Sequence, residues 1–127
     1  MKESKFQFKT PYLAELNFVN SFWEDGEEKV EMNNFFSIDI TDKKQNSAIV
    51  ELTLEVKKEN LQMPFVLKIK YASEFMWEED MEDAVVDKML RTNAPALLLS
   101  YMRPIIANLT NAAGYPAYNI PFMNFQK

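Results

Sequence analysis

The chain has 127 residues, a formal net charge of −5 and 47% hydrophobic residues. This length predicts one domain, residues 1–127, with a modest core. The acidic balance argues against non-specific nucleic-acid binding, which needs a basic surface. No apolar run is long enough for a membrane span, and residues 1–10 lack the apolar core of a secretory signal, so we expect a cytoplasmic protein.

Cysteine and histidine are both absent. Their absence excludes disulfides, thiol catalysis and zinc–thiolate sites, and removes the commonest general base. We therefore expect no catalytic residue, no metal and no cofactor. A small enzyme or hydrophobic-ligand-binding protein stays as an alternative, with candidate acids at Glu24–Asp25 and Glu78–Asp83, although runs of carboxylates usually form a solvated surface.

The first predicted element is a strand from Phe6 to Phe18, because apolar and polar residues alternate along it. Pro11 lacks a backbone donor, so we expect this strand to lie at a sheet edge or to bulge there. Residues 19–34 have no clear period and predict a long connection. Phe22 and Trp23 lie within it and either anchor the loop or form a sticky surface.

Three more strands are predicted, with alternating apolar residues at Phe36–Thr41, Val50–Lys57 and Phe65–Tyr71. The last of them continues to Phe75, Met76 and Trp77. For the final hairpin we predict an antiparallel register that gives one apolar and one polar face. In that register the partners are Val56 with Phe65, Leu54 with Leu67, Leu52 with Ile69, Val50 with Tyr71, Glu51 with Lys70, and Thr53 with Lys68.

Residues 78–92 predict a short acidic amphipathic helix with Met81, Val85 and Met89 or Leu90 on one side. A long helix follows. Asn93 is its predicted N-cap, Pro95 lies in its first turn, and Gly114 with Pro116 gives the stop signal. Pro104 is expected to bend it.

Apolar side chains surround most of this helix, which leaves a narrow stripe at Ser100, Arg103, Ala107 and Asn111. A helix of this kind is buried on more than one side. The sheet covers one side, and we expect a second copy of the chain to cover the other. The predicted oligomer interface comprises Leu98, Tyr101, Met102, Ile105 and Leu109. The alternative is that the acidic helix and the last ten residues cover it.

The stretch from Asn93 to Phe125, NAPALLLSYMRPIIANLTNAAGYPAYNIPFMNF, resembles the second half of the SecB family of export chaperones. The shared features are the Asn-Ala-Pro-Ala-Leu-Leu start, Tyr101 with Arg103, Tyr115 with Pro116, and the closing Pro121–Phe125. The resemblance extends over nearly the whole chain. It departs from the family at Ser100–Tyr101, where Pro-Tyr is common, at Pro104, at Val19, and in ending at Lys127 without the family's second helix and tail.

The resemblance implies an α+β fold, a four-stranded antiparallel sheet with a long helix packed on one face, assembled into a homodimer or homotetramer. It also implies an ATP-independent holdase that binds unfolded polypeptides, chiefly export precursors, and delivers them to the translocase motor SecA. Glu15 is the expected motor contact. A SecB-like chaperone dedicated to an antitoxin is the alternative.

Under this hypothesis exposed aromatic and methionine side chains bind clients through apolar contact. Ordinary core packing is the competing interpretation for each. The predicted client-binding residues are Phe22, Trp23, Phe75, Met76, Trp77, Tyr118, Ile120, Phe122 and Met123.

Overall fold

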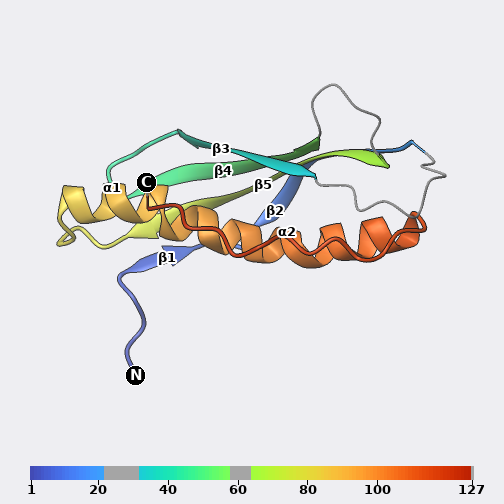
Figure 1. Cartoon of the computed structure of the whole chain (residues 1–127). Helices are drawn as coiled ribbons and strands as arrows, with labels where there is room; N and C mark the ends of the chain where they lie inside the picture. Colours follow the sequence, from blue (N-terminus) through green and yellow to red (C-terminus); the bar gives the residue numbers. More distant parts are fainter. Residues whose placement is uncertain (22–31, 58–63, 127) are drawn as a thin grey trace.

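The computed structural model describes residues 1–21, 32–57 and 64–126. It consists of one antiparallel sheet with both helices on the same face (Figure 1). The strands are β1 (Phe6–Phe8), β2 (Tyr12–Asn20), β3 (Asn33–Thr41), β4 (Ser47–Lys57) and β5 (Phe65–Trp77), and the helices are α1 (Asp83–Arg91) and α2 (Asn93–Ala112).

Strand β5 is the centre of the sheet. It pairs with β4 along one side, and with β1 and β2 in succession along the other, while β3 pairs with β4 at the far edge. The described strands therefore number five but occupy four positions. The predicted architecture is confirmed, with the first strand divided in two.

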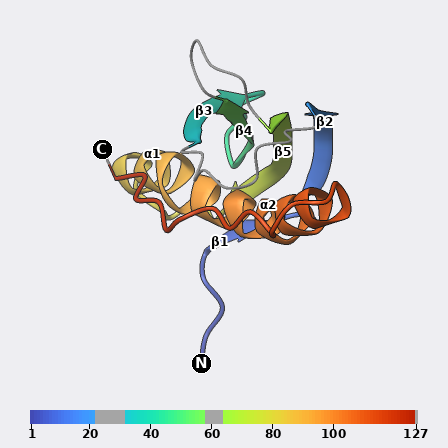
Figure 2. The ribbon, with the colours of Figure 1, turned by 45° about the vertical axis from the view of Figure 1, so that its right-hand side comes forward.

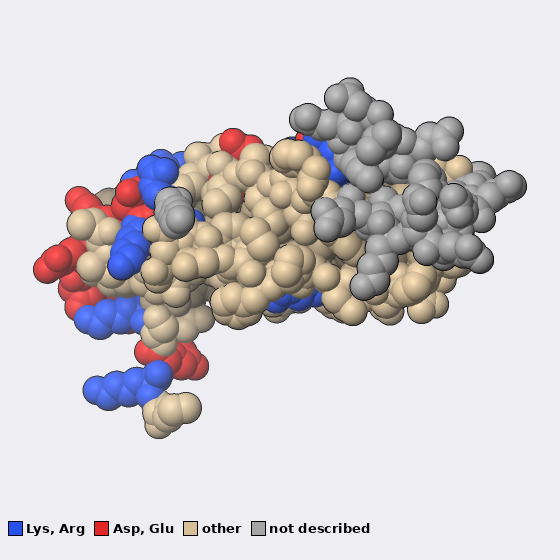
Figure 3. Space-filling view, viewed as in Figure 1, with Lys and Arg blue, Asp and Glu red and all other residues tan. Residues whose placement is uncertain are grey.

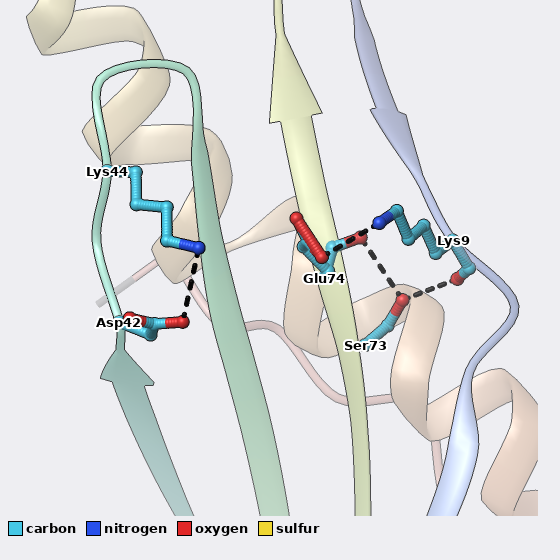
Figure 4. A network of polar contacts seen from close by, with 5 residues as sticks. All are labelled: Lys9, Asp42, Lys44, Ser73 and Glu74. Carbon is cyan, nitrogen blue, oxygen red and sulfur yellow. Dashed lines mark hydrogen bonds and ion pairs between the residues drawn. The ribbon is translucent and has the colours of Figure 1, made fainter.

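The first strand breaks around Pro11, as its missing donor predicts. Between β1 and β2 the chain stays attached to β5 by a network of polar contacts (Figure 4). The Lys9 amide donates to the Glu74 carbonyl at 2.9 Å, the Lys9 ammonium lies 3.0 Å from the Glu74 carboxylate, and the Ser73 hydroxyl donates to the Lys9 carbonyl. A register shift between Leu13 and Glu15 adds a bulge to β2.

The predicted register of the β4–β5 hairpin is wrong by two residues. The observed partners of Val56, Leu54 and Leu52 are Leu67, Ile69 and Tyr71. A shift of two preserves the alternation, so the assignment of side chains to faces is correct and the pairing is not. Thr53 consequently lies opposite Lys70, and Glu51 reaches Lys70 diagonally at 3.6 Å.

The core lies between the sheet and α2. Its fully buried members come from alternate positions of β4 and β5 and from one side of each helix. The fully buried side chains of largest volume are those of Leu52, Leu54, Leu67, Ile69, Phe75, Leu90, Leu98, Met102 and Ile106. Burial of a side chain of this size stabilises the fold by about 1.5–3 kcal/mol.

Both helices differ in detail from the expectation. On α1 the buried residues are Val86 and Leu90, whereas Val85 is exposed, so the apolar side is rotated by one residue. Thr92, not Asn93, is the N-cap of α2, and the helix continues through Pro104. Gly114 ends it with φ of 98°, a left-handed conformation that favours glycine.

The predicted connection between the first strands is shorter than 19–34, because β2 extends to Asn20 and β3 begins at Asn33. Within the described residues, neither helix combines the length and the apolar character that crossing a bilayer requires.

Candidate polypeptide-binding surface

After α2 the chain reverses. Residues 115–126, here called the return segment, run back along α2 towards α1, on the side of the helix that faces β3 (Figures 1 and 2). The segment contains neither helix nor strand. It also contains no charged residue. Side-chain contacts therefore hold this part of the chain, rather than a hydrogen-bonded ladder.

Hydrogen bonds of Tyr115 attach the beginning of the segment to the sheet. Its hydroxyl lies 2.6 Å from Asn20 Oδ1 and 2.8 Å from the Pro64 carbonyl oxygen. Asn20 in turn donates to the Ala113 carbonyl at 3.0 Å, and Ser21 N donates to Pro64 O at 2.8 Å. These hydrogen bonds join the end of β2, the start of β5 and the end of α2.

Three further hydrogen bonds join the described part of the segment to the body. The Tyr118 amide donates to the buried Thr110 hydroxyl at 2.9 Å, and the Tyr118 hydroxyl donates to Asn34 Oδ1 at 2.7 Å. The Arg103 guanidinium donates to the Pro121 carbonyl at 2.9 Å. Burial raises the pKa of the Tyr118 hydroxyl above its ordinary value, and the hydrogen bond to Asn34 opposes this in part.

Aromatic rings complete the attachment. Phe65 packs against Tyr115 and Tyr118 with centroids 5.7 and 6.1 Å apart, and Phe36 meets Phe125 edge-on at 5.7 Å. Ile120 is buried in the core cluster, while Met123 and Phe125 are half-buried against it. We call Asn34, Phe36, Phe65, Arg103 and Thr110 the docking site of the return segment.

The far end of the docking site is incompletely filled. A pocket of about 450 Å³ lies between β3, α1 and the end of the segment, lined by Ile38, Ile40, Arg91, Asn124 and Phe125. A second, of about 410 Å³, lies where the segment meets the start of α2, lined by Thr92, Asn93, Ala96, Phe122, Met123, Asn124, Phe125 and Gln126. On the face that carries α2, charged side chains gather around α1 while the middle is largely uncharged (Figure 3).

The two flanks of α2 are covered differently. The return segment covers the flank of α2 that carries Arg103 and Thr110, as the alternative interpretation expected of the last residues. The opposite flank carries Tyr101, Ile105 and Leu109. There Tyr101 is exposed, although its ring reaches Tyr71 of β5 at 6.1 Å.

The residues of the predicted oligomer interface divide by burial within one chain. Leu98 and Met102 are fully buried under the sheet and offer no surface to another molecule. Tyr101, Ile105 and Leu109 retain accessible surface, and the helix-facing side of β2 continues it with Leu13 and Leu16, both exposed.

The predicted client-binding residues divide by burial. Phe75, Trp77 and Ile120 are core residues, because their side chains point into the helix–sheet layer. Tyr118 and Met123 are half-buried at the docking site, and Phe122 is 93% exposed. Met76 is half-buried and pairs with Gln7 of β1. Phe22 and Trp23 lie outside the described residues.

The face of the sheet opposite the helices carries Glu15 and other charged residues, together with the exposed apolar side chains of Tyr12, Val19, Phe35 and Val66. The Glu15 carboxylate lies 3.3 Å from Lys68, and both side chains are exposed. Of the acids considered for catalysis, Glu24–Asp25 lies outside the described residues, and Asp80 forms a surface pair with Lys5. Among the described residues no group of three or more acidic side chains is arranged to hold a metal ion.

Sequence reasoning missed Arg103, Thr110 and Asn34 as holders of the return segment. Arg103 lies in the narrow stripe that interrupts the apolar surface of α2, and no partner was predicted for it. The sequence of residues 115–126 does contain a signal, because these residues include many apolar side chains and no charge, a composition that favours packing against the protein over exposure to solvent.

Comparison with known proteins gives a consistent result. A family model described as "Preprotein translocase subunit SecB" matches residues 2–127. Protein-export protein SecB of Anaplasma phagocytophilum is 34% identical over 83 residues, which cover 61% of this chain and 52% of the relative. SecB 1 of Francisella tularensis subsp. novicida is 27% identical over 129 residues, covering 97% of this chain and 85% of the relative. The chain thus spans about half the length of the Anaplasma relatives.

A solved structure shares the fold. It is a SecB-like chaperone of Mycobacterium tuberculosis in complex with a peptide from the HigA1 antitoxin, with a TM-score of 0.77 at 14% identity, covering 94% of this chain and 91% of that one. With the family model matching nearly every residue, the sheet, the two helices and the return segment belong to a member of the SecB family.

Proposed function

We propose that this chain is an ATP-independent holdase that acts in the cytoplasm and binds unfolded polypeptides, chiefly precursors destined for export. One observation carries the proposal. The helix-bearing side of the molecule already holds an extended, uncharged stretch of polypeptide, residues 115–126, next to two open pockets. A surface that holds one such stretch has the chemistry to hold others.

The binding energy would come from apolar side chains that leave water. Each client side chain of leucine or phenylalanine size contributes about 1.5–3 kcal/mol when fully buried. Several such contacts along one chain give useful affinity without a fixed client sequence. No bond is made or broken in this process, and no nucleotide is needed.

The direct test is aggregation suppression. An unfolded export precursor is diluted from denaturant into buffer with the purified protein and without ATP, and light scattering is followed. We expect scattering to fall as the protein approaches equimolar amounts. Undiminished scattering with the protein in excess would contradict the proposal. Suppression confined to a single antitoxin peptide, with no effect on unrelated precursors, would indicate a dedicated chaperone instead.

We also propose that the chain self-associates through the flank of α2 and the β2 edge. Leu13, Leu16 and Tyr101 supply exposed apolar surface there. Leu16→Glu should lower the mass measured by sedimentation at micromolar concentration. Phe35→Glu is the matched control, because Phe35 is on the β3 edge and both residues are 41% exposed. A wild-type protein that sediments as a monomer would exclude this assembly.

For the translocase motor SecA, we propose Glu15 as a contact on the helix-free face of the sheet. Its carboxylate is exposed beside Lys68, and that face lies away from the docking site. Glu15→Lys should weaken binding of the motor in a pull-down while aggregation suppression stays unchanged. If binding of the motor is equal for both proteins, Glu15 has no such role.

A further inference from the structure

The return segment is attached unevenly along its length. At its beginning, Tyr115 and Tyr118 have hydrogen-bond partners on β2, β3 and α2. At its far end, Phe125 has a ring contact with Phe36 and stands between two partly empty pockets. The segment is therefore easier to lift from its far end than from its beginning.

Two of the contacts that hold the segment recognise its backbone. Arg103 binds the Pro121 carbonyl, and the Thr110 hydroxyl accepts from the Tyr118 amide. Every polypeptide offers such carbonyl and amide groups. Arg103 Nε is buried and has no hydrogen-bond partner in the described structure, so the guanidinium keeps a donor to spare. These two residues can hold another extended chain as they hold this one.

The remaining contacts are made by apolar side chains at irregular intervals of two or three residues. Ile120, Met123 and Phe125 pack inward, whereas Asn119, Phe122 and Asn124 stay exposed. This is the pattern in which an unfolded polypeptide, extended and apolar, would enter the same positions. The occupant that the docking site fits is therefore an uncharged stretch of chain with apolar residues two or three positions apart.

We propose that the return segment is a built-in competitor, and that an unfolded polypeptide binds by displacing it from the docking site. This inference rests on the proposed holdase function. The client first places an apolar side chain in the 450 Å³ pocket between β3 and α1. Its side chains then replace Phe125, Met123 and Ile120 in turn. Arg103 and Thr110 exchange their hydrogen bonds to the segment's backbone for hydrogen bonds to the client's backbone. The segment thereby sets a minimum affinity for binding, which only sufficiently apolar chains reach.

A reversible lock tests the proposal. Ala96 and Met123 line the same pocket, and the natural chain contains no cysteine, so Ala96→Cys with Met123→Cys introduces the only two thiols. The pair is closed by oxidation or by a short bis-maleimide, and closure is confirmed by mass. The probe is fluorescein-labelled, reduced and carboxymethylated lactalbumin, measured by anisotropy. We expect closure to weaken binding at least tenfold, and reduction of the disulfide to restore it.

The matched control is a second cysteine pair on the opposite, helix-free face of the sheet. Thr41 and Ile49 are partners across β3 and β4, at a spacing that a disulfide can bridge. Closing Thr41→Cys with Ile49→Cys should leave binding of the probe unchanged. Equal binding by the open and closed forms of the Ala96–Met123 pair would overturn the proposal.

A release variant tests the same point without a crosslink. Ile120→Asp places a charge at a buried position of the segment, and Phe122→Asp places the same charge at a position that is 93% exposed. We expect Ile120→Asp to bind the probe several-fold more tightly and Phe122→Asp to bind like the wild type. Weaker binding by both variants would mean that the segment forms part of the client-binding surface and does not compete with the client for it, which would overturn the proposal. Circular dichroism checks that each variant is folded.

Failure of this inference differs from failure of the proposed function. If the wild-type protein binds the probe but the lock and the release variant change nothing, the holdase function stands and the competition is excluded. If neither the wild-type protein nor Ile120→Asp binds the probe, the holdase function itself fails.

Discussion

The two edges of the sheet have similar cross-strand pairs but differ in how their helix-facing side chains are covered. On the β3 edge, Phe36 is paired with buried Leu54 and is covered in part by Phe125. On the β2 edge, Leu16 is paired with buried Ile69, and its side chain stays 41% exposed. The chain covers one edge of its helix-facing layer with its own return segment and leaves the other open. The difference separates two roles, because one edge carries the docking site and the other is available to a second copy.

The largest effect is expected within the pair Leu16 and Ile69. Ile69→Ala removes a fully buried side chain from the middle of the core and should lower the free energy of unfolding by about 2–5 kcal/mol. Leu16→Ala, on its cross-strand partner, should cost under about 1 kcal/mol in a monomer. Urea unfolding at a concentration where the protein is monomeric measures both. Equal losses would mean that the β2 edge is covered within one chain.

On the covered edge, Thr110→Val is expected to cost about 1–3 kcal/mol, because the Tyr118 amide loses its buried acceptor. Thr53→Val is the control, since Thr53 is also buried but lies on the other face of the sheet. Hydrogen exchange of the return segment should rise in Thr110→Val alone. Unchanged protection of the Tyr118 amide would argue against this anchor.

A smaller effect should follow pH through Tyr118. Its pKa is raised by burial above the ordinary 10.0, so the folded state holds the phenol proton more tightly than the unfolded chain. Stability from this group is complete below pH 10 and is lost as pH rises through the folded pKa. Unfolding measured from pH 8 upwards should show this decline. Tyr118→Phe should be less stable by about 1 kcal/mol at pH 8 and lack this part of the slope.

The smallest effect is expected for the surface pair of Glu15 and Lys68. The two groups are 3.3 Å apart and both are exposed, so Glu15→Gln should cost about 0.2–1 kcal/mol at low ionic strength. The difference should vanish in molar salt, where screening removes such interactions. A loss that persists in high salt would show a contribution from packing.

Period-two and helical patterns were sufficient to predict the layers of the fold. Alternation placed Leu52, Leu54 and Ile69 on the apolar face, because every second side chain of a strand shares one face. The same rule could not distinguish the true register from one shifted by two residues. Both align apolar with apolar, and the choice depends on the length and geometry of a hairpin connection that the pattern does not contain.

The docking site was harder to predict than the fold. Arg103 interrupts the apolar surface predicted for α2 and had no predicted partner, yet its guanidinium holds the backbone of the return segment. Periodicity indicates which residues are buried, but it does not indicate which distant segment of the chain covers them. Phe75 and Trp77 show the converse problem. Aromatic residues at the end of a strand have the same sequence pattern whether they form a core or a sticky surface, and here they form the core.

The central position of β5 has a consequence for how the molecule comes into being. Strands near the start of the chain, β1 and β2, pair only with β5 among the described elements, and β5 ends at Trp77. During synthesis β1 and β2 therefore stay unpaired until β5, which ends at Trp77, has left the ribosome. Such distant pairing slows folding. Until β5 has emerged, the apolar side chains of β1 and β2 have no strand of this sheet to pack beside.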